Sequence, residues 1–259
     1  MSRDGACPWA VEFAGFAKQY PTGWLGVGRW TAVAGLTLRL APGQVMGILG
    51  PNGSGKSTVL KALAGLIRPS AGSCRVFGRE AGSDAARTRV GYLPEAPRFP
   101  PHLTAREMLA FCAGLSAFTG LHLELRVQQM LHWSGLQEVA DQPVGRFSKG
   151  MVQRLGLAQA ILHDPDLVLL DEPADGLDPD ARLGLERVLC DLAAHGRTIV
   201  FTSHLLARAD SICDRIALLG AGRLLAEGTP AELLGREASA PMAATALEKL
   251  YLDRFAAHG

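Results

Sequence analysis

Nine consecutive residues have the types and spacing of a loop that binds phosphate. The pattern G-x-x-x-x-G-K-[ST] is met by Gly50, Pro51, Asn52, Gly53, Ser54, Gly55, Lys56 and Ser57, and Thr58 completes the loop. Its glycines allow the backbone to turn tightly and to aim N–H groups at the β- and γ-phosphates of a nucleotide. Lys56 adds a positive charge, and the Ser57 hydroxyl is a suitable Mg²⁺ ligand. The loop therefore predicts nucleotide binding.

An acidic pair, Asp171-Glu172, follows a second apolar run. Asp171 in this place can hold Mg²⁺, directly or through water. Because side chains alternate along a strand, we expect Glu172 to point the other way and to polarise a water that attacks the γ-phosphate. The alternative is that both carboxylates only solvate the end of the strand. With a phosphate loop upstream, the pattern favours the Mg²⁺ site.

Three further places have both a chemical and a purely structural interpretation. Ser148 and Gly150 precede a helix expected to start near Met151, which either presents its N-terminus to an anion or is simply capped by Ser148. His204 follows a strand, where ligands bind in α/β sheets, or is an ordinary surface histidine. Glu95 also follows a short strand; it could reach Mg²⁺ or the attacking water, or lie free on the surface.

The elements that must position these residues are indicated by hydrophobic periodicity. Apolar runs predict buried strands at 45–49, 167–170 and 198–202, and a helix at 58–64 opens directly after the loop. Other strands are expected at 11–13, 36–40 and 74–77, an irregular loop at 21–30, an amphipathic helix at 180–195 and a hairpin at 216–226.

Strand signals vanish between residues 98 and 160. Helices are expected instead at 104–113, 121–134 and 151–162, the first with the capping-box pair Thr104 and Glu107. We interpret residues 98–160 as a helical subdomain inserted into an α/β core. After residue 235 a linker and a C-terminal helix at 245–256 are expected, so that residues 1–235 form one unit and 236–259 an appendage.

The composition excludes several classes of function. The net charge of +1 among 259 residues gives no indication of a nucleic-acid partner. The five cysteines are scattered and contain no C-x-x-C, which is typical of reduced thiols in the cytosol. No signal peptide and no run of 18 apolar residues is present, so we expect a soluble chain that can still dock on a membrane protein.

In this order the motifs resemble those of the nucleotide-binding subunit of ABC transporters, over about residues 11–235. The resemblance implies a P-loop NTPase of the ABC type, with a RecA-like core, an antiparallel β subdomain and an inserted α-helical subdomain. It makes Phe147–Met151 the family signature, Gly176–Pro179 with Asp178 the D-loop, and His204 the switch histidine. Tyr20 resembles the aromatic residue that stacks on adenine.

Departures from the family pattern are informative. Glu95 stands in place of the Q-loop glutamine, and the signature carries Lys149 and Met151 in place of Gly and Gln. Both variants resemble the exporter branch, in which the ATPase and the membrane subunit are separate chains. Tyr20 lies further upstream of the loop than is usual in the family, so that Trp24 or Trp30 could take its place.

The resemblance also implies a mechanism. Two copies, or this chain and a paralogous ABC subunit, sandwich two ATP molecules head to tail, with Ser148, Lys149 and Gly150 of one copy facing the loop of the other. Glu172 would activate water, His204 hold the γ-phosphate, and Lys56 neutralise charge, with Mg²⁺ at Ser57, Asp171 and Glu95.

We expect a cytoplasmic location, peripheral on the inner face of the cell membrane, with a multi-span permease as partner. The alternative is a soluble ABC ATPase of an assembly or maturation system, such as one for metal clusters or metalloenzymes. The transported substrate is not encoded in this chain.

Overall fold

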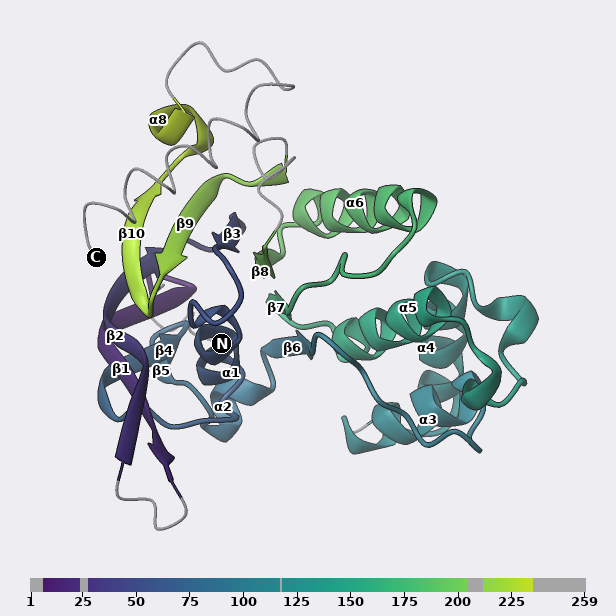
Figure 1. Cartoon of the computed structure of the whole chain (residues 1–259). Helices are drawn as coiled ribbons and strands as arrows, with labels where there is room; N and C mark the ends of the chain where they lie inside the picture. Colours follow the sequence, from purple (N-terminus) through teal and green to yellow (C-terminus); the bar gives the residue numbers. More distant parts are fainter. Residues whose placement is uncertain (1–6, 24–27, 117, 205–211, 235–259) are drawn as a thin grey trace.

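The structure is a computed structural model that describes residues 7–23, 28–116, 118–204 and 212–234. It contains two β-sheets and an arm of helices that extends to one side of them (Figure 1). No helix in these ranges combines the length and the apolar character that a membrane span requires. The linker and C-terminal helix expected after residue 235 lie outside the described residues.

The larger sheet carries the chemistry-bearing loops. Its strand order is β10-β9-β3-β8-β7-β6, and all neighbouring pairs are parallel except β10 with β9. The expected buried strands are confirmed in β3 (Val45–Leu49), β7 (Leu167–Leu170) and β8 (Thr198–Ser203), and the expected hairpin in β9 (Arg215–Gly220) and β10 (Arg223–Gly228). β6 spans Val90–Leu93 at the far edge of the sheet. Parallel pairing places the carboxyl ends of β3, β6, β7 and β8 along one edge.

The smaller sheet is antiparallel, with the order β2-β1-β4-β5. Its strands are β1 (Val11–Thr22), β2 (Gly28–Leu40), β4 (Ala71–Val76) and β5 (Arg79–Glu80). The irregular loop expected at 21–30 was wrong at both ends, because β1 extends to Thr22 and β2 begins at Gly28, and the two strands pair Tyr20 with Trp30 and Thr22 with Gly28. The two rings stack with centroids 5.9 Å apart. This cross-strand aromatic pair stabilises the strands although the glycines of the segment favour a loop.

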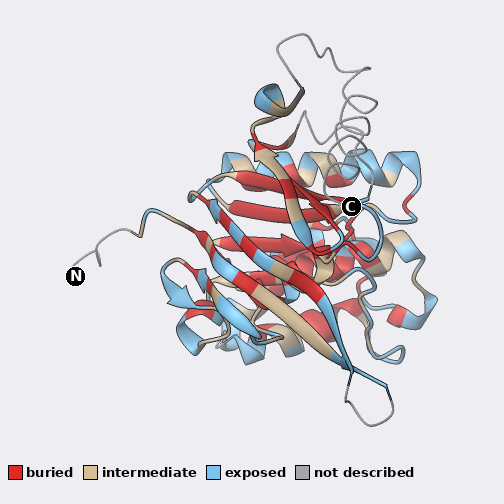
Figure 2. Ribbon diagram, turned by 60° about the vertical axis from the view of Figure 1, so that its left-hand side comes forward, coloured by how far each residue is buried: buried red, intermediate tan, exposed pale blue. Residues whose placement is uncertain are grey.

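One hydrophobic core lies between the two sheets around α1 (Lys56–Leu63). Phe13 and Phe16 of β1 pack there edge to face, 5.1 Å apart, and Ile48 of β3 and Leu60 of α1 are fully buried beside them. Figure 2 shows the buried strands of both sheets beneath a partly exposed outer layer. This packing fixes the helix that follows the phosphate loop against the sheet.

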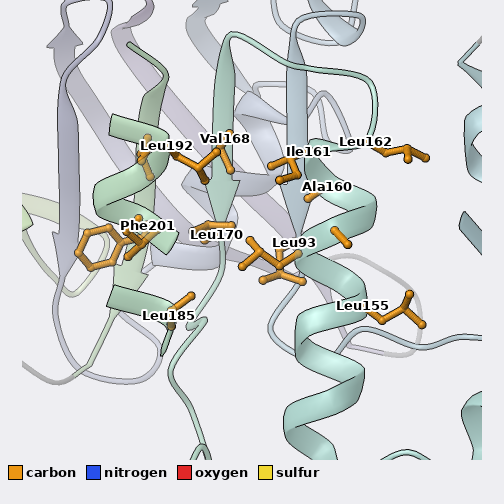
Figure 3. Close-up of a cluster of buried hydrophobic side chains, with 14 of the residues drawn as sticks. Leu93, Leu155, Ala160, Ile161, Leu162, Val168, Leu170, Leu185, Leu192 and Phe201 are labelled. Atoms are coloured by element: carbon orange, nitrogen blue, oxygen red, sulfur yellow. The ribbon is translucent and has the colours of Figure 1, made fainter. Parts of the chain in front are cut away.

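A second core covers the opposite face of the larger sheet. It joins β6, β7 and β8 to α5 (Lys149–Ile161) and α6 (Pro179–Ala194). Figure 3 shows the meeting point, where Leu93, Val168, Leu170 and Phe201 from the strands face Ile161 of α5 and Leu185 and Leu192 of α6, while Leu155 points from α5 to the side away from the strands.

Helices α3 (Ala105–Leu115), α4 (Gly120–Trp133) and α5 form the arm, with short helical turns at Gln137–Val139 and Val144–Arg146. All three expected helices are confirmed, although α5 begins at Lys149 and not at Met151. The capping box is also confirmed: the Glu107 N–H donates to Thr104 Oγ1 at 3.1 Å, and the Thr104 N–H donates to Glu107 Oε2 at 2.8 Å. Two short helices complete the described chain, α2 (Asp84–Arg87) and α8 (Pro230–Leu234).

Candidate nucleotide-binding site

The loop from Gly50 to Gly55 joins β3 to α1, as the sequence predicts. Gly50 has φ 155° and Gly55 has φ 101°, a region that residues with a Cβ rarely adopt. A Cβ at Gly50 would also collide with the Leu219 carbonyl oxygen, and one at Gly55 would lie 2.6 Å from the Ala32 carbonyl oxygen. Ser54 Oγ is buried and has no hydrogen-bond partner. The loop thus holds a hydroxyl group without a hydrogen-bond partner, from which a phosphate oxygen could accept a hydrogen bond.

Lys56 is the first residue of α1 and only 5% exposed. Its Nζ donates hydrogen bonds to the carbonyl oxygens of Gly50 at 2.8 Å and Pro51 at 3.1 Å. It also lies 3.1 Å from Glu172 Oε1, an ion pair whose geometry does not make a hydrogen bond. Because a buried ammonium is costly unless paired, Glu172 stabilises Lys56 in the folded protein without nucleotide.

Asp171 follows β7 and meets α1 across the sheet edge. Its Oδ1 accepts from Ser57 Oγ at 3.0 Å and from Thr202 Oγ1 at 2.8 Å. A hydroxyl and a carboxylate oxygen are the hard ligands that Mg²⁺ prefers, and Mg²⁺ usually takes only one or two protein groups beside water and phosphate oxygens. The pair fits this ion, and among the described residues no cluster of three or more metal-binding side chains provides a fuller cage.

Glu172 is placed by its backbone and not by strand alternation. β7 ends at Leu170, and Glu172 takes φ 45°, so the alternation that we used to orient it does not extend to this residue. Its N–H donates to Thr202 Oγ1 at 2.8 Å. Its Oε2 accepts from the His204 N–H at 3.1 Å and lies 2.9 Å from His204 Nδ1. Glu172 therefore joins Lys56 to His204, and its side chain is 9% exposed.

Thr202 is a site residue that the sequence analysis treated only as part of a strand. It is fully buried in β8 and binds both Asp171 and Glu172 through one hydroxyl. Leu170 pairs with Phe201 in the parallel ladder, which brings the residues after β7 beside Thr202. A polar residue at the end of an otherwise apolar strand was the available signal.

The signature residues form a second group. Ser148 caps α5, with its Oγ accepting from the Met151 N–H at 3.3 Å, and Lys149 Nζ lies 3.6 Å from Asp175 Oδ2. Asp178 caps α6, with Oδ1 accepting from the Ala181 N–H at 2.8 Å. Ser148, Gly150 and Asp178 line one cavity of about 380 Å³ between α5 and α6.

This second group is not brought to the phosphate loop within one chain. Figure 1 shows the N-terminal ends of α5 and α6 on the side of the molecule away from α1, with the C-terminal end of α5 toward β7. The candidate residues therefore form two separate groups, which we call half-sites. One carries the loop, Asp171, Glu172 and His204, and the other carries Ser148, Lys149, Gly150 and Asp178.

The roles expected for Tyr20 and Glu95 at the site stay predictions. Tyr20 lies on the hairpin, stacked on Trp30 and 5.2 Å below Lys18 Nζ, and its contact with adenine stays a prediction. Trp24, the other candidate, lies outside the described residues. Glu95 is exposed two residues after β6, at the sheet edge where Asp171 follows β7. Its role at Mg²⁺ stays a prediction, which Glu95→Gln would test through a weaker response of nucleotide binding to Mg²⁺.

Comparisons with known proteins agree with this geometry. The family model described as ABC transporter matches residues 33–175. An uncharacterized ABC transporter ATP-binding protein of Nostoc sp. is 41% identical over 233 residues, which are 89% of this chain and 69% of that protein. Nod factor export ATP-binding protein I of Paraburkholderia xenovorans is 38% identical over 230 residues, 88% of this chain and 73% of that protein.

Two solved structures share the fold. One, the ATP-binding subunit of an ABC transporter, has a TM-score of 0.80 at 28% identity and covers 95% of this chain and 99% of its own. The other is the ATP-binding cassette MJ0796 as a dimer in a post-hydrolysis state with ADP and phosphate, with a TM-score of 0.77 at 25% identity over 85% of this chain and 98% of its own. The fold is thus the P-loop NTPase fold of ABC cassettes, and this chain belongs to the ABC transporter ATP-binding family.

Proposed function

We propose that this chain hydrolyses ATP as one half of a head-to-tail dimer and energises export through a separate transmembrane permease. The observation that carries the proposal is the separation of the two half-sites within one chain. Lys56, Asp171 and Glu172 gather at the carboxyl edge of the sheet, whereas Ser148 and Asp178 lie at the N-terminal ends of α5 and α6, on the side away from α1.

The chain's own residues supply the hydrolytic chemistry. Backbone N–H groups of the loop and the N-terminus of α1 bind the phosphates, and Lys56 exchanges its contact with Glu172 for one with a phosphate. Glu172, released from Lys56 and still held by His204 and the Thr202 hydroxyl, then accepts a proton from the attacking water. Ser57 and Asp171 would hold Mg²⁺, which neutralises developing phosphate charge when bound.

A second copy would complete each site. The N-terminus of α5 already satisfies one N–H through Ser148, and the following turn presents a helix end with partial positive charge. Facing a phosphate of the opposite copy, this end gains an anionic partner. The dimeric form of the MJ0796 cassette supports this arrangement.

Complementation between two inactive variants tests the dimer. Lys56→Ala removes the loop's cation, and Ser148→Arg blocks the signature, so each variant alone should lose ATP hydrolysis. Mixed together, they form a heterodimer in which one site combines an intact loop with an intact signature. We expect hydrolysis to reappear in the mixture, whereas a mixture as inactive as its components would speak against a shared site.

The second part of the proposal is that ATP hydrolysis by this chain drives export. Its support is the named function of the Paraburkholderia relative, Nod factor export, and the signature and Q-loop variants at Lys149 and Glu95. The alternative is an ABC ATPase of an assembly or maturation system. Affinity purification of the full chain from solubilised membranes separates the two: a multi-span protein that copurifies and stimulates ATP hydrolysis supports export, and recovery of this chain without any membrane protein favours assembly.

A further inference from the structure

Tyr92 lies beside the Asp171 carboxylate on the face of the sheet that carries α1. In the parallel ladder of β6 and β7, Tyr92 pairs with Leu169, and the Asp171 N–H donates to the Leu93 carbonyl oxygen at 2.9 Å. Paired residues of a parallel ladder point to the same face of the sheet. Tyr92 and Leu169 both pack on the core around α1, and Asp171, two residues after Leu169, reaches Ser57 of that helix.

The Tyr92 hydroxyl is buried without a hydrogen bond. Its oxygen exposes less than 1 Å² and has no partner at hydrogen-bonding geometry. Buried polar groups are nearly always paired, and an unpaired one at a binding site calls for a ligand-dependent explanation. A tyrosine ring placed here only for packing would be served as well by phenylalanine.

Charges around the hydroxyl keep it a donor. Burial raises the pKa of Tyr92, and the Asp171 carboxylate raises it further through its charge and through a close approach to the hydroxyl that falls short of a well-aligned hydrogen bond; the charge of Glu95 adds a smaller effect in the same direction. The group therefore carries its proton at neutral pH and lies within reach of Asp171. Asp171 Oδ1 already accepts two hydrogen bonds, and a carboxylate has about four acceptor sites, so room for a third donor remains.

We propose that Tyr92 is a positioning residue whose hydroxyl donates a hydrogen bond to the Asp171 carboxylate when nucleotide and Mg²⁺ are bound. The proposal rests on the proposed function, since it assumes that Asp171 serves Mg²⁺. Groups that orient a metal-binding carboxylate typically change metal affinity by about 10–100-fold when removed. Tyr92 would thus raise the affinity for nucleotide in the presence of Mg²⁺ and have no effect on the affinity in its absence.

Tyr92→Phe in the full chain tests the proposal by calorimetric titration with a non-hydrolysable ATP analogue. The analogue is titrated once with Mg²⁺ and once with EDTA. We expect unchanged affinity in EDTA and about tenfold weaker affinity with Mg²⁺. Thr198→Val is the matched control, because Thr198 is a buried residue on β8 whose hydroxyl accepts from the Gly43 N–H at 2.9 Å, at the opposite end of the strand from Thr202.

Thermal unfolding without nucleotide gives a second, independent result. Because the hydroxyl makes no well-aligned hydrogen bond in the nucleotide-free protein, Tyr92→Phe should lower the unfolding temperature less than Thr198→Val does. An unchanged Mg²⁺ effect on affinity in Tyr92→Phe, or an equal loss with Mg²⁺ and EDTA, would overturn the proposal. If the unmodified protein itself shows no gain from Mg²⁺, the proposed function falls as well, so the two failures are distinguishable.

Discussion

Thr202 provides the sharpest prediction on how the acidic pair is held. Its single hydroxyl donates to Asp171 Oδ1 at 2.8 Å and accepts from the Glu172 N–H at 2.8 Å. Thr202→Val keeps the β-branched shape and replaces the hydroxyl with a methyl group. The substitution leaves the backbone N–H of Glu172 without an acceptor and removes one of the two hydroxyl groups that donate to Asp171 Oδ1.

The size of the effect follows from these two contacts. A hydrogen bond to a charged group contributes about 1.5–3 kcal/mol, and an orphaned buried N–H costs about 1–3 kcal/mol. The buried methyl group offsets about 1 kcal/mol of this loss. We therefore expect the free energy of unfolding to fall by about 1.5–5 kcal/mol. ATP hydrolysis should fall about tenfold or more because both carboxylates lose their orientation.

Urea unfolding and steady-state ATP hydrolysis are the two assays, with Thr198→Val as the control. Thr198 is equally buried on the same strand, and its hydroxyl accepts from the Gly43 N–H far from the acidic pair. The control should lose stability and keep its hydrolysis rate per folded molecule. A Thr202→Val protein within about 0.5 kcal/mol of the unmodified protein, the spread of neutral surface changes, would refute the reasoning.

Three other changes have definite outcomes. Lys56→Ala should abolish ATP binding in calorimetry, and normal affinity would contradict the assigned role of Lys56. Gly91→Ala should lower the free energy of unfolding by about 1–3 kcal/mol in urea, because a Cβ there collides with the Ala160 carbonyl oxygen of α5. An unchanged free energy of unfolding would show that α5 moves aside without measurable cost. Burial lowers the pKa of His163 below its unfolded value, so the unfolded chain binds the proton first and stability should fall as pH drops below about 6.5. In His163→Gln the free energy of unfolding should depend less on pH between about pH 7 and pH 5.5. The same pH dependence as in the unmodified protein would show that another group causes it.

The parts that the sequence predicted are those with a local cause. The phosphate loop, its strand and its helix occupy one continuous stretch, where glycine positions and apolar periodicity directly report the backbone. The helices of the arm likewise follow from periodicity and from the capping box at Thr104 and Glu107.

The parts that were missed depend on contacts between distant segments. Thr202 reaches Asp171 because the register of β7 and β8 places them side by side, which no pattern within either strand reveals. Glu172 leaves the strand alternation because its φ is positive. Strands β1 and β2 extend into the segment 21–30 because Tyr20 pairs with Trp30 across the strands, against the local preference of its glycines.

The central claim is that Glu172 activates water in a site shared by two copies, and Glu172→Gln tests it most directly. Light scattering with ATP and Mg²⁺ is combined with a measurement of released phosphate. We predict that the variant shifts from monomer to dimer on adding ATP while its hydrolysis falls by about 100-fold or more. Hydrolysis at the unmodified rate, with no ATP-dependent dimer, would contradict it.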